Sequence, residues 1–391
     1  MKEDTLIVTA GRDPESNHGI VNPPVYHAST VLFPTVAALE KSQKQRLDSN
    51  TVYYGRFGTP TTFAFQNAMA QLDDGHRAIA VASGKCAILV SLMAFLKSGD
   101  HLLMVDSAYG PTRDLCNGLL ARFGVTTTFY DPLIGSDIAN LIRPETQVVF
   151  TESPGSQTFE IQDIGVISRT AHENDCIVVM DNTWATSLFF KPFEHGVDVV
   201  VQAATKYILG HSDAMLGVIT TNAKNFEPIQ RAALDFGAPP GPDDVYLAQR
   251  GLRTLGVRLA RHMATGLRIA SWLQVQPQVA KVLHPGLPND PGHSIWSRDF
   301  HGASGLFGLV LKQTTKAMLA KMLDKMQLFK MGYSWGGYES LMIPTDPEKQ
   351  RTATCWRPEG PTLRIHAGLE DPDDLIRDLE QGLSRPALLR Q

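Results

Sequence analysis

Apolar residues gather into short runs between positions 78 and 221, and helix-like stretches separate these runs. The seven runs span residues 78–83, 101–106, 125–131, 146–153, 176–182, 197–203 and 215–221. The stretch 111–124, between two of them, shows apolar residues at helical spacing and ends in a glycine. Continuous apolar strands that alternate with helices predict an α/β fold with a mostly parallel sheet sandwiched by helices.

The two ends of the chain follow other patterns. The early segment "GIVNPPVYHASTVLFPT" (19–35) is rich in proline, which predicts an extended arm that needs a surface to lie on, such as a neighbouring subunit. After residue 250, strands and helices stop alternating regularly, and a long helical stretch covers 247–274. We therefore expect an N-terminal arm (1–58), a large α/β domain (59–250) and a smaller C-terminal α+β domain (251–391).

Composition and charge exclude several classes of partner. The formal net charge is −4, which gives no electrostatic basis for binding nucleic acid or an anionic membrane. The sequence has no apolar leader and no run that approaches a membrane span, so we expect a cytoplasmic protein. No HExxH motif is present, and we expect no metal site. The cysteines share no CxxC motif and are expected to be free thiols: Cys86, Cys116, Cys176 and Cys355.

Several polar residues stand where predicted strands end. Asp181 closes one run, Lys206 follows the next, and Tyr109 follows the run at 101–106. The turn "SGK" (83–85) joins the first run to a helix. Alone, each feature is usually a cap, a solvated charge or a simple turn. Because active sites in such sheets lie beyond the carboxyl ends of the strands, their convergence on one edge favours a functional site.

These residue types match one kind of ligand. A helix N-terminus after a Ser-Gly turn offers backbone N–H groups to a phosphate. A tyrosine can stack on a flat ring, and a buried carboxylate can keep a ring nitrogen protonated. Desolvation lowers the pKa of a buried lysine, so that its amine can form a Schiff base with an aldehyde. Pyridoxal 5′-phosphate (PLP) carries the phosphate, the ring, the ring nitrogen and the aldehyde.

Six segments in order along the chain carry a resemblance to a known family. They are "YGRFGTPT" (54–61), "ESPGSQTFEIQD" (152–163), "DNTWA" (181–185), "QAATKYILGHSDAMLG" (202–217), "QRGLRTLGVRL" (249–259) and "YSWGGYESL" (333–341). The sequence resembles, nearly end to end, the PLP-dependent Cys/Met-metabolism family of fold-type I enzymes. The resemblance implies an aspartate-aminotransferase-like fold with a seven-stranded sheet, and a homotetramer built as a dimer of dimers.

The resemblance assigns the cofactor-binding roles residue by residue. Lys206 is expected to form the Schiff base, Asp181 to hold the pyridine nitrogen, and Tyr109 to stack on the ring and take part in catalysis. The phosphate is expected to bind the turn at Gly84 and Lys85 and the hydroxyl of Thr205. The side chain of Lys85, which stands where relatives often have Met, Ala or Gln, is expected to face solvent. "QAAT" replaces the "SAT" of many relatives, which removes one hydroxyl near the phosphate.

The resemblance also implies a shared site. Tyr54 and Arg56, in "YGR", correspond to the pair that reaches the phosphate of the adjacent subunit. Arg364, in "TLRIHAGLED", corresponds to the arginine that binds the substrate α-carboxylate, a role that suits a planar guanidinium. Ser334 is expected to line the same end of the site, together with its neighbours Tyr333 and Trp335.

The stretch "YSWGG" bears on the reaction. Relatives that act at the γ carbon usually have "ESLGG" there, and the aromatic residues Tyr333 and Trp335 would narrow the distal pocket unless they only pack. We therefore expect α,β-elimination of L-cystathionine to homocysteine, pyruvate and ammonia. The alternatives are a γ-lyase, a γ-synthase, a broad cysteine-S-conjugate β-lyase, or a regulatory protein that binds PLP without turnover. Whether Tyr109 transfers a proton or only orients the substrate stays open.

Overall fold

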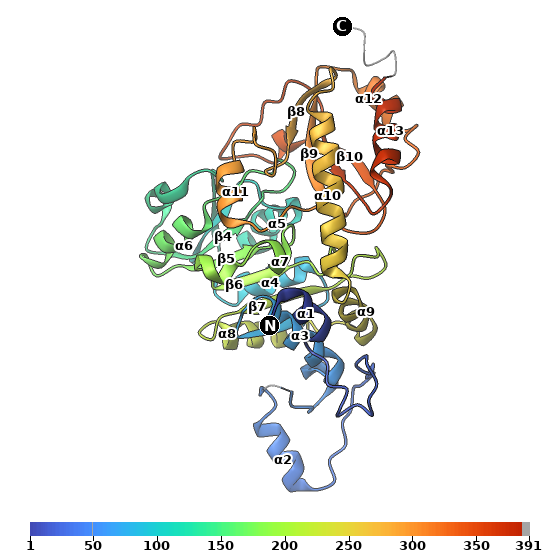
Figure 1. Cartoon of the computed structure of the whole chain (residues 1–391). Coiled ribbons are helices and arrows are strands. Elements are labelled where there is room, and N and C mark those ends of the chain that lie inside the picture. The colour runs from blue at the N-terminus through green and yellow to red at the C-terminus, as the bar shows by residue number, and fades with distance from the viewer. Residues whose placement is uncertain (49, 385–391) are drawn as a thin grey trace.

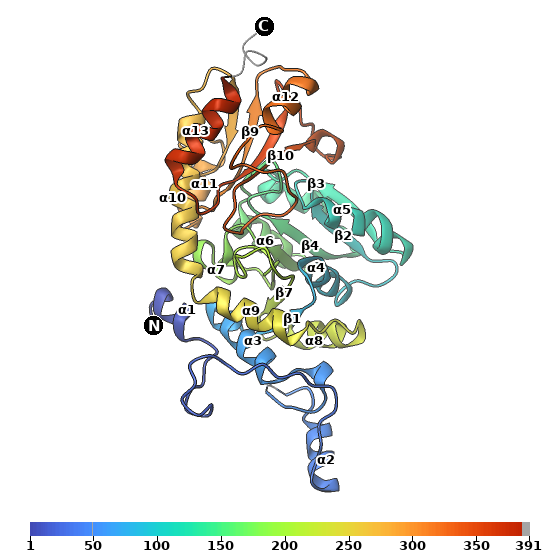
Figure 2. The ribbon, with the colours of Figure 1, turned by 90° about the vertical axis from the view of Figure 1, so that its right-hand side faces the viewer.

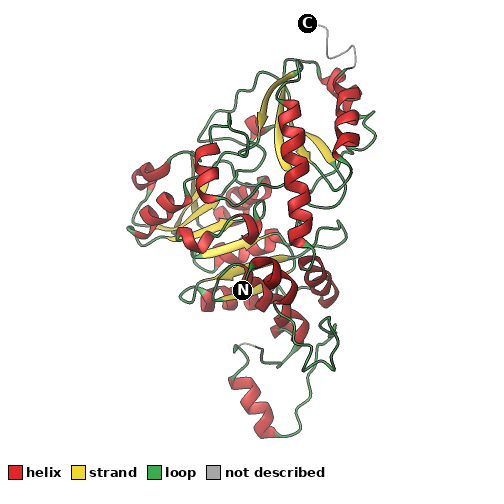
Figure 3. Cartoon of the chain, viewed as in Figure 1, coloured by secondary structure: helices red, strands yellow, loops and turns green. Residues whose placement is uncertain are grey.

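The structure is a computed structural model that describes residues 1–48 and 50–384 (Figure 1). It contains a large sheet and a small sheet, each covered by helices, and a projecting N-terminal segment (Figures 1 and 3). Within the described residues, no helix is long and apolar enough to cross a membrane. The four cysteines are free.

The large sheet has seven strands in the order β1-β7-β6-β5-β4-β2-β3. Strands β2 to β6 run parallel, which confirms the prediction of a mostly parallel sheet. β7 is antiparallel to both β1 and β6, because the segment between β6 and β7 contains no crossover helix and returns the chain directly. The strand bounds are Arg77–Val81 (β1), His101–Val105 (β2), Thr126–Tyr130 (β3), Thr146–Glu152 (β4), Ile177–Asp181 (β5), Val199–Gln202 (β6) and Gly217–Thr221 (β7).

Helices pack on this sheet and bury its strands. β2 and β7 are buried at every position, as their continuous apolar sequences predicted. The predicted helix at 111–124 is present as a short α-helix that passes into a π-helical turn at Cys116–Leu120. The helices of this part are α3 (Pro60–Leu72), α4 (Gly84–Met93), α5 (Gly110–Leu115), α6 (Ile164–His172), α7 (Thr186–Phe189), α8 (Phe226–Asp235) and α9 (Pro242–Leu252).

The small sheet forms the C-terminal part and is antiparallel, in the order β10-β11-β9-β8. Its apolar face shares a core cluster with the long helix α10 and with the C-terminal helix, both beside the sheet in Figure 2. This confirms the smaller C-terminal domain. The bounds are α10 (Leu255–Leu273), β8 (Val279–Leu283), α11 (His293–Asp299), β9 (Leu306–Leu311), α12 (Lys316–Leu323), β10 (Leu341–Thr345), β11 (Thr362–His366) and α13 (Pro372–Leu383).

The helical stretch expected at 247–274 is two helices, because α9 ends at Leu252 and α10 begins at Leu255. Gly251 lies so close to a neighbouring loop that a Cβ there would stand 2.2 Å from the carbonyl oxygen of Ile208. The guanidinium of Arg258 donates to the carbonyl of Gly251 at 2.8 Å and so satisfies part of the end of α9. The break is therefore fixed by packing that helical periodicity does not reveal.

The N-terminal segment is less extended than its prolines suggested. It contains the helices α1 (Glu3–Thr9) and α2 (Val36–Lys44). α1 is held against the body by buried Ile7, whereas α2 buries none of its residues and projects away from the rest of the chain (Figures 1 and 2). Between these helices the chain has no regular structure, and Ile20, Val21 and Leu32 are exposed.

Candidate active site

Lys206 lies in the turn that follows β6, beside the end of β5. β6 is paired with β5 so that Val201 stands opposite Asp181, which brings the two strand ends together. The backbone N–H of Lys206 donates to the carbonyl of Ala203 at 3.0 Å and closes the turn. On the other side, a Cβ on Gly336 would stand 2.9 Å from the carbonyl carbon of Lys206, and Gly336 has φ +89°. Only glycine fits there without strain, so the segment from the C-terminal part packs directly on the lysine backbone.

The amine of Lys206 is held in a partly desolvated, positively charged environment. Its Nζ donates to the hydroxyl of Ser334 at 2.7 Å and lies 5.2 Å from the ring centroid of Trp335. Burial and the nearby guanidinium of Arg364 lower the pKa of Lys206 from 10.5 to about 8, although Asp181 acts in the opposite direction. The amine is therefore much more nucleophilic near neutral pH than a surface lysine.

Asp181 ends β5 and is oriented by Thr183. The backbone N–H and the hydroxyl of Thr183 both donate to Oδ1, at 2.9 and 2.5 Å, so Oδ2 takes no part in these two bonds. The hydroxyl of Thr183 also accepts from the N–H of Ala203 at 2.8 Å. It thereby connects Asp181 to the turn that carries Lys206, which we call the lysine turn. Burial raises the pKa of Asp181, while the bonds from Thr183 and the charge of Lys206 lower it. Such a carboxylate can hold a cationic ring nitrogen.

Tyr109 stands at the N-terminus of α5, and its side chain is partly exposed. Its backbone N–H donates to Oε2 of Glu152 at 2.7 Å. Burial raises the pKa of its phenol, as do the charges of Glu152 and Asp181, whereas Arg364 lowers it. The phenol thus stays protonated near neutral pH and can donate a proton or a hydrogen bond. It shares one electrostatic environment with Asp181 and Arg364.

Glu152 belongs to this cluster and was missed in the sequence. It ends β4 and is paired in register with Asp181 on β5. Burial raises its pKa well above the ordinary value, and the adjacent Asp181 raises it further, while the N–H of Tyr109 opposes both. Glu152 stands at the end of the run 146–153, so the rule that selected Asp181 at the end of its strand would also have selected Glu152.

Arg364 comes from β11 of the small sheet. Its Nη2 donates to the carbonyl oxygen of Ser334 at 2.8 Å. Burial lowers the pKa of the guanidinium, and Tyr109 and Tyr333 raise it. Ser334, which bonds Lys206 through its hydroxyl, has φ +90°, a conformation that costs a non-glycine residue on the order of 1–3 kcal/mol. Ser334 is thus held in a strained conformation between the two cations.

The turn at 83–85 lies against the lysine turn. A Cβ on Gly84 would stand 2.5 Å from Cβ of Ala203, so glycine is needed for this approach. Ser83 caps α4 by accepting from the N–H of Cys86 at 3.1 Å, and the side chain of Lys85 is exposed. The hydroxyl of Thr205 bonds the backbone of Leu216, at 3.2 Å to the carbonyl and 3.0 Å to the N–H.

Carbonyl groups of the lysine turn accept hydrogen bonds from a buried guanidinium. Arg258 of α10 donates to the carbonyl oxygens of Tyr207 at 2.6 Å and Ile208 at 3.3 Å, besides that of Gly251. A Cβ on Gly210 would stand 2.0 Å from Nη1 of Arg258, so a side chain there would displace the guanidinium. The turn therefore depends on a residue far along the chain.

The remaining residues expected at the site are not all brought to it. Arg56 donates to the carbonyl of Leu234 in α8 at 2.9 Å. The hydroxyl of Tyr54 accepts from Ser29 at 3.3 Å. Tyr333 is 91 % exposed. Trp335 packs on Tyr207 with ring centroids 5.3 Å apart. Within one chain, Tyr54 and Arg56 make these contacts away from Lys206.

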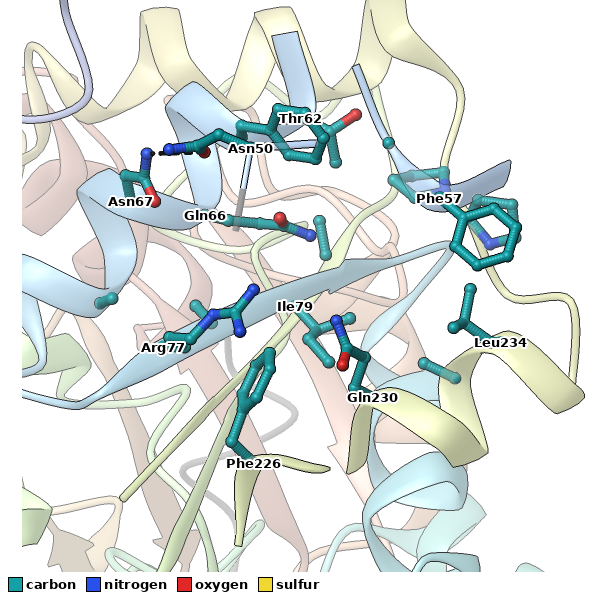
Figure 4. Close-up of a pocket in the computed structure, with 18 of the residues that line it drawn as sticks. Asn50, Phe57, Thr62, Gln66, Asn67, Arg77, Ile79, Phe226, Gln230 and Leu234 are labelled. Carbon is teal, nitrogen blue, oxygen red and sulfur yellow. Dashed lines mark hydrogen bonds between the residues drawn. The ribbon is translucent and has the colours of Figure 1, made fainter. Parts of the chain in front are cut away.

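A cavity of about 320 Å³ lies beside Arg56, between α3, β1 and α8 (Figure 4). Arg77 on its wall stacks over the ring of Phe226, 3.9 Å from the centroid. Lys206 and the residues that share its electrostatic environment do not line this cavity. The cavity is thus separate from the group of charged residues around Lys206.

The residues around Lys206 fit PLP. The first N–H groups of a helix have no partner within it, and Ser83 caps only that of Cys86, so those of Gly84 and Lys85 remain for a phosphate. The missing side chain of Gly84 lets the turn at 83–85 pack directly on Ala203, which brings these N–H groups next to the turn that carries Lys206. The carboxylate of Asp181 and the amine of Lys206 are groups of the kind that the ring nitrogen and the aldehyde of PLP would require as partners.

The architecture and this set of donors define a fold-type I PLP enzyme. The family model for Cys/Met metabolism PLP-dependent enzymes matches residues 4–384, and the chain belongs to this family. It is 44% identical to cystathionine beta-lyase MetC of Escherichia coli K12 and 45% identical to cystathionine beta-lyase of Salmonella typhimurium LT2, over 98% of each chain. The crystal structure of metB from Corynebacterium glutamicum is 29% identical, with a TM-score of 0.90 over 98% of both chains.

Proposed function

We propose that this chain is a cystathionine β-lyase, which converts L-cystathionine and water to homocysteine, pyruvate and ammonia. The observation that carries the proposal is the arrangement at Ser334, where one residue holds a lysine amine of lowered pKa and the guanidinium of Arg364, which we propose binds the substrate carboxylate. Relatives at 44–45% identity that carry this name support it.

The proposed proton transfers use the amine of Lys206. PLP, when bound, supplies an aldehyde for the substrate amine and a ring that draws electrons from Cα. The neutral Lys206 amine takes the proton from Cα, and its lowered pKa makes it a suitable base. The same amine, now –NH₃⁺, gives a proton to sulfur as the Cβ–S bond breaks and homocysteine leaves as a thiol. Water then releases the remaining carbon skeleton as pyruvate and ammonia.

Other residues hold the reacting groups. Arg364 binds the α-carboxylate in a bidentate manner and so fixes the direction of the Cα–H bond. Asp181, oriented by Thr183, keeps the ring nitrogen protonated. Tyr109 would stack on the ring and take part in catalysis, either by orienting the substrate or by transferring a proton, and the bond from its backbone N–H to Glu152 holds its backbone.

We infer that the functional unit contains more than one chain. Gly84, Lys85 and Thr205 are proposed to hold the phosphate from one chain, and Tyr54 and Arg56 to reach it from a neighbour in a dimer of dimers. The projecting arm with its exposed apolar residues supports this assembly. We also propose that the chain is divided into an N-terminal arm (1–58), a large α/β domain (59–250) and a C-terminal domain (251–391).

The choice of β over γ cleavage rests on the segment at 333–337. Cleavage at Cγ needs a second deprotonation, at Cβ, and therefore a second, well-placed acid–base event. Trp335 lies 5.2 Å from Nζ of Lys206, where we propose that it narrows the distal pocket, and no carboxylate stands at position 333.

An assay of products from L-cystathionine tests the proposal. Pyruvate and homocysteine are expected from β-elimination. A dominance of 2-oxobutyrate and cysteine would contradict the β-lyase assignment and favour a γ-lyase. A protein that binds PLP and turns over neither L-cystathionine nor the substrates of the other candidate enzymes would instead fit the regulatory alternative.

A further inference from the structure

A buried carboxylate, Asp106, joins the large domain to a segment of the C-terminal part, three residues before Tyr109. Its side chain is 0% exposed. It accepts the backbone N–H groups of Thr352, Ala353 and Thr354 at 3.0, 3.1 and 2.9 Å. The two threonine hydroxyls also donate to it, at 3.2 and 2.8 Å. One carboxylate thus binds three consecutive backbone N–H groups, those of residues 352–354, in the short stretch that we call the latch segment (351–354).

A second anchor holds the latch segment to the large domain. The side chain of Arg351 is 4% exposed, and its Nη2 donates to Oε1 of Glu160 at 2.6 Å and also to Thr158. Both partners belong to the loop that follows β4. Arg113 of α5 balances the charge of Asp106 and donates to Oδ1 at 2.9 Å. The latch segment is therefore bound from two sides by charge-assisted hydrogen bonds.

The position of the latch segment links it to Arg364. The segment follows β10, and β10 pairs with β11 so that Ile343 stands opposite Arg364. Just before the latch segment, Gln350 lies against α5, because a Cβ on Gly110 would stand 3.3 Å from its Nε2. Gly110 directly follows Tyr109. The bonds to the latch segment thus connect the strand pair that carries Arg364 with the loop that carries Tyr109.

We propose that Asp106 and Arg351 are positioning residues, which dock the latch segment and so set the place of Arg364 relative to Lys206 and Tyr109. The inference rests on the proposed function in so far as Arg364 binds the substrate carboxylate. A substrate held at its carboxylate by Arg364 presents its Cα–H to Lys206 only if the two sheets keep their relative position. Misplacement by about 1 Å costs on the order of a hundredfold in rate.

The alternative is that Asp106 only stabilises the fold, and the chain offers a matched control for that. Asp378 of α13 is also a buried carboxylate, and it accepts the backbone N–H groups of Gln327, Leu328 and Phe329 at 2.8, 2.8 and 3.1 Å. All four residues belong to the C-terminal part. Neutralising Asp378 therefore weakens a comparable set of hydrogen bonds to backbone N–H groups and leaves the contact between the domains unchanged.

The experiment compares Asp106→Asn with Asp378→Asn as PLP-loaded enzymes. Both substitutions should lower Tm, and both proteins should keep the borohydride-trapped cofactor on Lys206. Asp106→Asn should raise KM for L-cystathionine, and the Kd for glycine read from the visible absorption of the cofactor, by roughly five- to fiftyfold. Asp378→Asn should change each by less than about twofold. Equal changes in the two variants at similar Tm would overturn the proposal.

Two milder variants keep the test decisive if Asp106→Asn does not fold. Thr354→Val removes the hydroxyl that donates to Asp106 and accepts from Arg351, while it keeps the backbone bonds to Asp106, and Arg351→Lys weakens the second anchor. Each should raise the glycine Kd by about two- to tenfold, and unchanged values in both would refute the proposal. The glycine titration also separates the proposed function from the proposed role of the latch segment. A wild type that does not cleave L-cystathionine refutes the proposed function, but the glycine Kd values of the variants still test whether the latch segment positions Arg364.

Discussion

Lys206, in the turn that follows a strand of the large sheet, and Arg364, on a strand of the small sheet, are both bound to Ser334. The amine donates to the Ser334 hydroxyl at 2.7 Å, and the guanidinium donates to the Ser334 carbonyl at 2.8 Å. The proposed base and the proposed carboxylate-binding group are thus fixed to one strained residue. Arg364 also lowers the pKa of Lys206, so the proposed carboxylate-binding group also increases the fraction of the lysine amine that is neutral near neutral pH.

Lys206→Ala should abolish covalent attachment of PLP, because Lys206 has the amine of lowered pKa beside Asp181. After borohydride reduction of the wild type, peptide mapping should find the adduct on Lys206. Lys191 is a useful internal control, since it is also buried but is engaged by Glu3 and Asp74 and has a raised pKa. An adduct on Lys191 or Lys85 would show that the assignment is wrong.

The rate at which apoprotein takes up PLP should rise with pH and level off above a midpoint near pH 8. Only the neutral amine attacks the aldehyde, and the pKa of Lys206 is lowered to about 8, so its neutral fraction grows as pH passes that value. Arg364→Gln removes a positive neighbour and should move the midpoint to higher pH. Stopped-flow absorbance gives the midpoint, and a wild-type value near the ordinary 10.5 would contradict the environment described.

Glu152→Gln should stabilise the apoprotein progressively as pH rises. The pKa of Glu152 is raised in the folded state, so the full stability of the folded wild type is present while the group is protonated. This stability is lost as pH rises above about 4.5, the pKa of the glutamate in the unfolded chain. Glutamine cannot ionise and avoids this loss. The difference in Tm between variant and wild type should therefore increase from pH 4.5 toward neutral pH, and a difference that decreases would refute the interpretation.

Arg364→Lys should be severely impaired with L-cystathionine. Loss of a bidentate charged contact costs about 2–4 kcal/mol of transition-state stabilisation, or roughly 30- to 1000-fold in kcat/KM. Arg268→Lys, at an exposed ion pair with Asp373, is the matched control and should leave kcat/KM unchanged. Similar losses in both variants would remove the special role of Arg364.

A mixture of Arg56→Ala and Lys206→Ala proteins should regain activity that neither has alone. In a hybrid dimer, one site receives both the arginine from one chain and the lysine from the other. The contact of Arg56 with Leu234, away from Lys206 in the single chain, motivates this prediction. If labelled subunits exchange and no activity returns, the site is not shared.

A strand-end rule predicted Lys206, Asp181 and Tyr109 from the sequence, although the same rule could also have selected Glu152. Lys206 and Asp181 follow continuous apolar runs, so the parallel sheet places them together whatever the details of packing. Arg364 lies within β11, where no local pattern distinguishes it, and only the family resemblance assigned it a role. The bonds of Ser334 to two sheets, and the break between α9 and α10, come from contacts between distant segments that periodicity does not encode.

The buried guanidinium of Arg258 has a consequence for exchanging parts between relatives. It satisfies carbonyls of the lysine turn, at Tyr207 and Ile208, although it lies in α10, beyond the break at 253–254. A chimaera joined at that break would unite a lysine turn from one parent with a supporting arginine from another. Recombination should therefore succeed only where both parents supply a matching pair of Gly210 and Arg258, so the apparent seam between the domains is a poor crossover point.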